Sequence, residues 1–147
     1  MQKYVLGFIF DDEEENILLI QKQRPLWQKG LFNGVGGKVE IFDDNHFSAI
    51  QREVFEETNL TIKNWKYFAK LTDQQFFDID CFKTNISQEQ LKTYQTMTDE
   101  DVQIKNIESL YKTKFNDCIS NLSWLIGICL DKDNSKMFHN IMYRNEK

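Results

Sequence analysis

The chain has 147 residues, the length of one ordinary domain, and a net charge of −5 at pH 7. Hydrophobic residues make up 41 % and charged residues 28 %, which are values of a globular protein rather than a disordered one. The negative charge argues against a nucleic-acid polymer as partner, because sequence-independent binding needs a basic surface. Small nucleotides stay open as ligands, since a bound cation can reverse the local charge. We expect a single α/β (α+β) domain over residues 1–147.

The cysteines and the start of the chain indicate a cellular compartment. Cys81, Cys118 and Cys129 are widely spaced and form no C-x-x-C pair. This pattern predicts reduced, mostly buried thiols of an intracellular protein. The N-terminus lacks the basic and apolar segments of a signal peptide, and no apolar run approaches about 18 residues. We therefore expect a soluble, cytoplasmic protein with no membrane partner.

The first half of the chain is typical of strands around turns. Residues 3–10 and 17–21 are β-prone and apolar, and the acidic run at 11–15 between them predicts a solvated hairpin tip. A loop containing Pro25 follows. Residues 35–40 then predict a short strand flanked and interrupted by glycines, which let other groups approach the backbone closely.

A helix is expected directly after this strand, with Asp44 or Asn45 as its N-cap. Its apolar stripe consists of Phe47, Ile50 and Val54. Asn59 stands where a left-handed residue usually ends a helix. His46, on the acidic side of the helix, is expected to be a surface residue.

The second half of the chain predicts further strands and one packed helix. We expect strands at 66–71, 75–83 and 102–107, a polar loop with a short helix at 85–100, and a helix at 119–130. The tail around Phe138 and Tyr143 is compatible with a final strand and equally with a partner contact, and the sequence does not decide between them.

Three carboxylates of the first helix point to a metal. At about 100° per residue, Glu53, Glu56 and Glu57 project into one arc of about 100°. Two of them stand in the last helical turn, where the helix dipole disfavours anions by about 0.3–1 kcal/mol each. A solvated acidic face is the alternative, but folding alone would favour cations at this end. Oxygen ligands of this kind suit Mg²⁺, and also Mn²⁺.

The segment from Gly37 to Leu60 resembles the Nudix box, G-x5-E-x7-R-E-U-x-E-E-x-G-U, in which U is apolar. Arg52-Glu53-Val54 and Glu56-Glu57 match the centre of this motif, and Leu60 supplies its final apolar position. The preceding N-G-V-G-G-K of residues 33–38 resembles MutT-type members, which act on nucleoside triphosphates. The resemblance implies a mixed β-sheet with flanking helices and a catalytic strand–loop–helix.

The chain departs from the motif at two positions. The first acidic residue is Asp44, reached with one extra residue after Gly37, or Asp43, which moves the extra residue to the other side. Asn59 replaces the penultimate glycine. Because asparagine tolerates the left-handed conformation, we expect the helix end to be retained.

The resemblance implies roles for the residues of the box. Glu53, Glu56 and Glu57 would be catalytic metal ligands, with Glu53 also close to the attacking water. The carbonyl group of Gly36 would complete a metal site. Arg52 would orient a glutamate, unless it is only a surface ion-pair partner.

Other site residues are expected outside the helix. Within the acidic segment 99–101, which is otherwise a solvated loop, Glu100 is our choice for a further metal ligand. Arg24, Asn33 and Lys38 are expected to bind substrate, although Lys38 also fits an exposed strand position. Asn121 would read a purine edge, unless it only caps the last helix. Trp27, in the loop before the box, is a candidate for contacting a base. Tyr67, Phe76 and Phe82 are candidates for stacking on one, although a Phe-rich strand is more often core.

The first functional hypothesis is a Mg²⁺-dependent Nudix pyrophosphohydrolase. It would cleave a nucleoside triphosphate, for example 8-oxo-dGTP, to a monophosphate and pyrophosphate. One alternative is a Nudix hydrolase of ADP-ribose or dinucleoside polyphosphates. Another is a non-catalytic nucleotide-sensing module on the same fold, which the lengthened segment at 43–44 favours.

Overall fold

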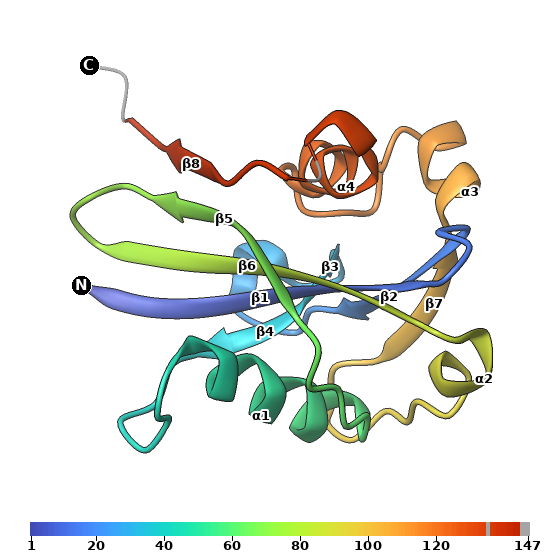
Figure 1. Ribbon diagram of the computed structural model, residues 1–147, viewed down its shortest axis with the longest axis horizontal. Helices are drawn as coiled ribbons and strands as arrows, with labels where there is room; N and C mark the ends of the chain where they lie inside the picture. The colour runs from blue at the N-terminus through green and yellow to red at the C-terminus, as the bar shows by residue number, and fades with distance from the viewer. Residues whose placement is uncertain (135, 145–147) are drawn as a thin grey trace.

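The computed structural model describes residues 1–134 and 136–144, which form a mixed eight-stranded sheet flanked by helices (Figure 1). The strand order is β3-β2-β1-β6-β5-β8, and β4 and β7 pair with β1 and β2. The strands are β1 (Gln2–Asp11), β2 (Asn16–Gln21), β3 (Phe32–Asn33), β4 (Val35–Lys38), β5 (Lys66–Thr72), β6 (Phe77–Ile86), β7 (Val102–Asn106) and β8 (His139–Met142). The helices are η1 (Leu26–Gln28), α1 (His46–Thr58), α2 (Gln88–Leu91), α3 (Ile107–Lys112), α4 (Leu122–Leu130) and η2 (Lys132–Asn134). The α/β (α+β) class and the mixed sheet are as predicted.

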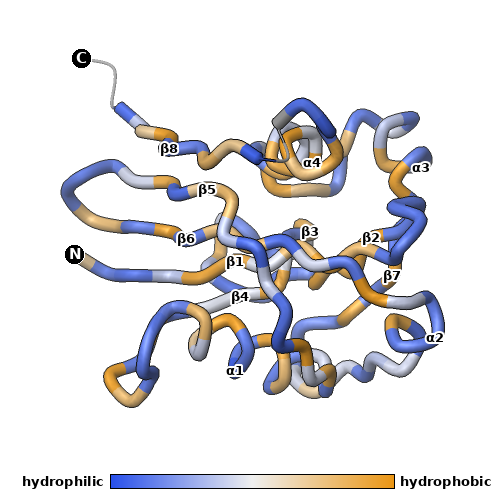
Figure 2. The backbone as a smooth tube through the Cα atoms, viewed as in Figure 1, coloured by the Kyte–Doolittle hydropathy of each residue, from blue (hydrophilic) through white to orange (hydrophobic). Residues whose placement is uncertain are grey.

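Strand β1 is bonded along both edges. Its ten residues pair in parallel with β6, and its other edge pairs antiparallel with β4 and β2. Because side chains alternate along a strand, Val5 and Ile9 enter one hydrophobic core and Phe8 and Phe10 enter another. Helix α1 covers the first core and α4 covers the second, on opposite faces of the sheet (Figure 1). Figure 2 shows hydrophobic stretches in α4 and along the central strands, and mainly hydrophilic connections between the elements.

Helix α1 begins and ends at residues with suitable caps. The side chain of Asn45 accepts a hydrogen bond from the Ser48 amide at 2.9 Å, so Asn45 rather than Asp44 is the N-cap. Asn59 is left-handed, with φ of 62°, and its amide donates to the Phe55 carbonyl. The predicted helix end is therefore confirmed. Ile50 and Val54 are buried, whereas Phe47 is partly exposed.

Non-local contacts moved several predicted boundaries. Helix α4 begins at Leu122 rather than 119, because the Ile119 amide donates to the Phe32 carbonyl and ties this segment to β3. Strand β7 ends at Asn106, whose side chain accepts from the Ser109 amide and caps α3, a helix that the sequence analysis missed. The tail forms strand β8, which pairs in parallel with β5.

The acidic run forms a hairpin tip as predicted, with Asp12, Glu13 and Glu15 exposed, but Asp11 belongs to β1. Asp11 is fully buried and accepts hydrogen bonds from the amides of Glu15 and Asn16. All three cysteines are buried and none forms a disulfide, as predicted. Within residues 1–134 and 136–144, no helix is long and apolar enough to cross a bilayer.

Candidate active site

Two glycines of β4 allow close contacts on either side of the strand. A Cβ at Gly36 would lie 2.0 Å from the Val5 carbonyl oxygen of β1, so backbone pairing requires glycine there. A Cβ at Gly37 would lie 2.5 Å from Oε1 of Glu53. The Glu53 carboxylate therefore rests directly on the Gly37 backbone. This contact joins the glycine strand to α1, as the strand–loop–helix prediction required.

Glu53 is a buried carboxylate, with 8 % of its surface exposed. Burial raises its pKa above the ordinary 4.5, and the charges of Glu56 and Glu57 raise it further. Hydrogen bonds from Arg52 oppose this rise. The result is a carboxylate that favours a cation or a proton more than an exposed glutamate does.

Arg52 connects the loop before α1 to two glutamates. Its Nη1 donates to Glu53 Oε1 at 3.0 Å and to Glu56 Oε2 at 3.1 Å. Its Nε and Nη2 donate to the two oxygens of Asp43 at 2.8 and 2.9 Å, and Nη2 also donates to the Lys38 carbonyl at 3.0 Å. Arg52 is therefore far more than a surface ion-pair partner. It fixes the orientation of the catalytic glutamate candidates relative to β4.

Asp43, and not Asp44, occupies the acidic position of the motif. Its hydrogen bonds with Arg52 hold the pKa of the Asp43 carboxyl below its ordinary value. Asp44 is exposed. The extra residue is consequently accommodated between Asp43 and the helix. The Arg52 guanidinium is also covered by the exposed ring of Phe42, whose centroid lies 5.3 Å away.

A second group of contacts lies at the last turn of α1. The Thr98 hydroxyl donates to Glu57 Oε2 at 3.0 Å. Glu100 is 4 % exposed, with one oxygen 3.1 Å from Lys22 Nζ and the other accepting from the Gln23 amide at 2.7 Å. Burial raises the pKa of Glu57, as does the charge of Glu100, whereas the Thr98 hydrogen bond and Lys22 lower it. The charge of Glu100 therefore acts on Glu57, the last carboxylate of α1.

The carboxylate cluster of Glu53, Glu56, Glu57 and Glu100 has the chemistry of a divalent-metal site. All its donors are hard oxygens, and burial and mutual repulsion make an added cation favourable. Within the described residues, no three His, Cys, Asp or Glu side chains meet in the arrangement of a formed metal site. The internal cations Arg52 and Lys22 engage three of these carboxylates instead. The donor set thus fits Mg²⁺ or Mn²⁺, and these ion pairs would have to rearrange on binding.

The expected substrate residues lie in different surroundings. Arg24 pairs with exposed Asp99 and is directed toward the loop of Glu100. The Lys38 side chain is exposed. Asn33 accepts a hydrogen bond from the next amide, Gly34, at 2.8 Å.

Asn121 occupies the N-cap position of α4, but its side chain makes no capping hydrogen bond. Its Nδ2 lies 3.2 Å from the Tyr143 hydroxyl, and its buried Oδ1 has no hydrogen-bond partner among the described residues. Cys118 pairs with Phe32 in an isolated β-bridge and the Ile119 amide donates to the Phe32 carbonyl, so the segment before Asn121 runs beside β3.

Several aromatic and histidine assignments require correction. Phe82 is fully buried under α1, so it cannot stack on a base. His46 is not a plain surface residue: its Nδ1 lies 2.9 Å from Asp80, and its ring packs against Phe82 and Tyr67. Tyr67 also donates to Asp80 at 2.6 Å. Trp27 on η1 and Phe76, directly before β6, remain exposed aromatic candidates.

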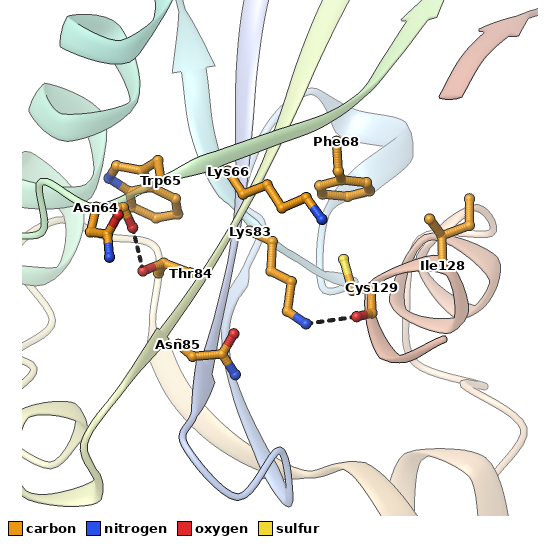
Figure 3. A pocket seen from close by; sticks show the side chains of 9 residues that line it. All are labelled: Asn64, Trp65, Lys66, Phe68, Lys83, Thr84, Asn85, Ile128 and Cys129. Carbon is orange, nitrogen blue, oxygen red and sulfur yellow. Dashed lines mark hydrogen bonds between the residues drawn. The ribbon is translucent and has the colours of Figure 1, made fainter. Parts of the chain in front are cut away.

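A separate pocket of about 270 Å³ lies between β5, β6 and α4 (Figure 3). Lys83 crosses it and donates to the Cys129 carbonyl at 2.7 Å, and its ammonium also pairs with Glu14 at 3.1 Å. None of the expected site residues lines this pocket. It is therefore distinct from the carboxylate cluster.

Comparison with known proteins identifies the family. The model of the NUDIX domain matches residues 1–115. No curated protein was found to match the sequence. A MutT protein from Bacillus halodurans has a similar structure, with a TM-score of 0.66, 17 % identity, and coverage of 97 % of this chain and 90 % of that one.

Two further structures contain nucleotide ligands. The NUDIX domain of Shewanella oneidensis NrtR, complexed with ADP ribose, has a TM-score of 0.70, 15 % identity and coverage of 85 % and 83 %. A bifunctional NMN adenylyltransferase/ADP ribose pyrophosphatase from Francisella tularensis, complexed with AMP and a Mn ion, has a TM-score of 0.67, 20 % identity and coverage of 88 % and 41 %. The chain belongs to the Nudix hydrolase family, enzymes that act on pyrophosphate bonds in nucleotide-type compounds.

Proposed function

We propose that this protein is a Mg²⁺-dependent pyrophosphohydrolase that converts a nucleoside triphosphate to a monophosphate and pyrophosphate. Mn²⁺ would also serve as its metal. The carrying observation is the Glu53 carboxylate, buried against Gly37 and oriented by Arg52. Such a buried, oriented carboxylate beside a glycine strand suits metal and phosphate chemistry. The proposal treats residues 1–147 as one Nudix domain, and the free, buried cysteines support a cytoplasmic location.

The residues divide the chemistry between them. A bound divalent ion would neutralise phosphate charge and lower the pKa of water, and Glu53, Glu56, Glu57, Glu100 and the Gly36 carbonyl would hold it. Glu53 has a raised pKa and is suited to accept the proton of the attacking water. Arg52 keeps Glu53 in position through its hydrogen bonds to Asp43 and to the Lys38 carbonyl.

Asn33 and Asn121 support a nucleoside triphosphate as substrate. Contacts of Phe32 with Cys118 and Ile119 place β3 beside the segment before α4, so the two asparagines stand on neighbouring segments. The free, buried Oδ1 of Asn121 is suited to accept a hydrogen bond from a base. Arg24 and the exposed Lys38 would contact phosphate. A purine such as that of 8-oxo-dGTP offers donors along its edge.

ADP-ribose is the second candidate substrate. Two structurally similar proteins support it, since one is complexed with ADP ribose and the other is an ADP ribose pyrophosphatase. Dinucleoside polyphosphates contain the same type of bond. A non-catalytic nucleotide sensor is disfavoured by the complete set of Arg52, Glu53, Glu56 and Glu57 contacts.

The test is release of phosphate and pyrophosphate with Mg²⁺ from ordinary and oxidised nucleoside triphosphates, ADP-ribose and dinucleoside polyphosphates. We expect pyrophosphate from a triphosphate, with a loss of about 10²–10⁴-fold in Glu53→Gln. Glu89→Gln, on an exposed glutamate of α2, is the matched control and should keep full activity. If the folded wild-type protein binds nucleotide but hydrolyses none of these compounds, the enzyme hypothesis is wrong and the nucleotide-sensor hypothesis takes its place.

A further inference from the structure

Lys22 forms an ion pair with the most deeply buried carboxylate of the cluster. It follows strand β2, and its ammonium lies 3.1 Å from Oε1 of Glu100. The side chain of Glu100 is only 5 % exposed, against 20 % for Lys22. The second oxygen of Glu100 is held independently by the Gln23 amide at 2.7 Å. Glu100 would therefore keep one anchor if the lysine moved away.

The loop of Glu100 also contacts the last turn of α1. The Thr98 hydroxyl, two residues before Glu100, donates to Glu57 Oε2 at 3.0 Å. Lys22 thus stands beside a loop that carries one carboxylate and contacts another. A divalent cation binding to the same carboxylates would encounter the ammonium at close range, where like charges repel strongly.

We propose that Lys22 is a displaceable counter-ion, which a divalent metal expels from Glu100 and which then binds the polyphosphate chain of the substrate. The inference rests on the proposed function, because it takes Glu57 and Glu100 as metal ligands. Lysine suits this exchange since its ammonium ends a flexible four-carbon stem. A polyphosphate offers the released ammonium a new anionic partner. Lys22 would then be a positioning residue that couples metal entry to substrate binding.

The alternative is a purely structural ion pair between β2 and the loop before β7. The two interpretations predict opposite effects on metal affinity. If Lys22 only holds the loop, its removal loosens Glu100 and weakens or does not change metal binding. If Lys22 competes with the metal, its removal strengthens metal binding while weakening substrate binding.

The experiment is a Mn²⁺ titration followed by electron paramagnetic resonance of free Mn²⁺. We expect the Kd of Lys22→Met to fall by about five- to tenfold, in the usual range for coupled binding. Lys22→Arg restores the positive charge and should return the Kd toward the wild-type value. Lys29→Met removes one exposed positive charge from the same loop and should leave the Kd unchanged. In kinetics with the triphosphate, Lys22→Met should raise KM about tenfold with a much smaller change in kcat.

A second measurement follows Lys22 in the wild-type protein and needs a variant only to assign its signal. Lysines of the wild-type protein are labelled by reductive methylation with ¹³C, and the Lys22 signal is assigned by its loss in Lys22→Arg. Addition of Mg²⁺ should shift this signal while the Lys29 signal stays fixed. If Lys22→Met binds Mn²⁺ no more tightly than the wild type, or Mg²⁺ does not move the Lys22 signal, the inference is wrong and the proposed function stands. If the folded wild-type protein binds no Mn²⁺, the proposed metal-dependent function fails with it.

Discussion

Arg52 and Asp43 meet through two parallel hydrogen bonds, from Nε to Oδ1 at 2.8 Å and from Nη2 to Oδ2 at 2.9 Å. This bidentate geometry is among the stronger ionic contacts in proteins. It closes the loop between β4 and α1 despite the extra residue. Because the same guanidinium also binds Glu53, the loop length and the catalytic carboxylate are mechanically connected.

Replacing the arginine tests this connection. Arg52→Lys keeps the charge but removes the planar fork, so it cannot bind Asp43 and Glu53 together. We expect kcat/KM to fall by about 10–100-fold, the usual effect of losing a partner of metal ligands. Steady-state kinetics and a Mn²⁺ titration measure it. Asp43→Asn should show a smaller loss, whereas Asp44→Asn, at an exposed position, should behave as wild type. Equal effects of both aspartate variants would contradict the assignment of Asp43.

Gly37→Ala should lower the turnover rate while the protein still folds. The new methyl group would lie about 2.5 Å from Glu53 Oε1, so the carboxylate must move. A displacement near 1 Å in a catalytic group costs on the order of 10²-fold in rate. Gly127→Ala is the control: nothing lies within 4 Å of its added Cβ, and alanine favours helix α4 by roughly 0.5–1 kcal/mol. Thermal unfolding and turnover of both variants test the prediction. Full activity in Gly37→Ala would show that Glu53 need not rest on the glycine.

As the pH is lowered, the affinity of the site for metal should fall. This fall should begin at a higher pH than it would for a site made of exposed glutamates. The folded protein raises the pKa of Glu53 and Glu57 above 4.5, chiefly by burial, and protons therefore compete with the metal earlier. Without metal, each raised pKa lowers the free energy of unfolding as the pH rises from 4.5 through the raised pKa of the folded protein. Asp43 has the opposite sign: its stabilising effect is present above 3.8 and is lost as pH falls through its lowered pKa. Mn²⁺ titrations between pH 5 and 8, roughly the range of maximal protein stability, measure the first effect. A pH-independent Kd across this range would contradict it.

Tyr143→Phe should alter base selection with little effect on chemistry. The change removes the hydroxyl beside Asn121 Nδ2 and keeps the ring against Phe77, 6.0 Å away between centroids. Losing one such hydrogen bond costs about 1 kcal/mol, or roughly fivefold. We expect KM for the preferred purine to rise by this factor while kcat is unchanged. Tyr111→Phe, on the exposed side of α3, is the control. An unchanged ratio of KM values between purine and pyrimidine triphosphates would argue against base reading by Asn121.

Local signals made α1 and its carboxylates predictable. Asn45, the apolar spacing and Asn59 all lie within one helix and its two ends, so their meaning does not depend on the rest of the fold. The spacing of Glu53, Glu56 and Glu57 likewise fixes a shared helix face. Asp43 and Asp44 could not be separated, because either fits the motif with one extra residue. Only the hydrogen bonds of Arg52 distinguish them.

Contacts between segments far apart in the chain could not be predicted from the sequence. Lys22 and Glu100 are 78 residues apart and meet because β7 pairs with β2. The start of α4 depends on the bond from the Ile119 amide to Phe32, again a contact between distant segments. His46 was expected at the surface because its helical position faces the acidic side. Its pairing with Asp80 required the position of β6 to be known.

The double pairing of β1 has a consequence for hydrogen exchange. Its amides and carbonyls bond to β6 on one edge and to β4 and β2 on the other, so no partial opening frees this strand alone. In the antiparallel pair only alternate β4 residues direct their amides at β1, so the amide of Gly37, opposite Val5, should exchange only through global unfolding. Lys22 and Glu100 stand in connecting segments outside the paired strands and should exchange through smaller openings. Within the candidate site, the amides of β1 and of Gly37 would thus exchange most slowly. The segments that carry Lys22 and Glu100 would exchange fastest.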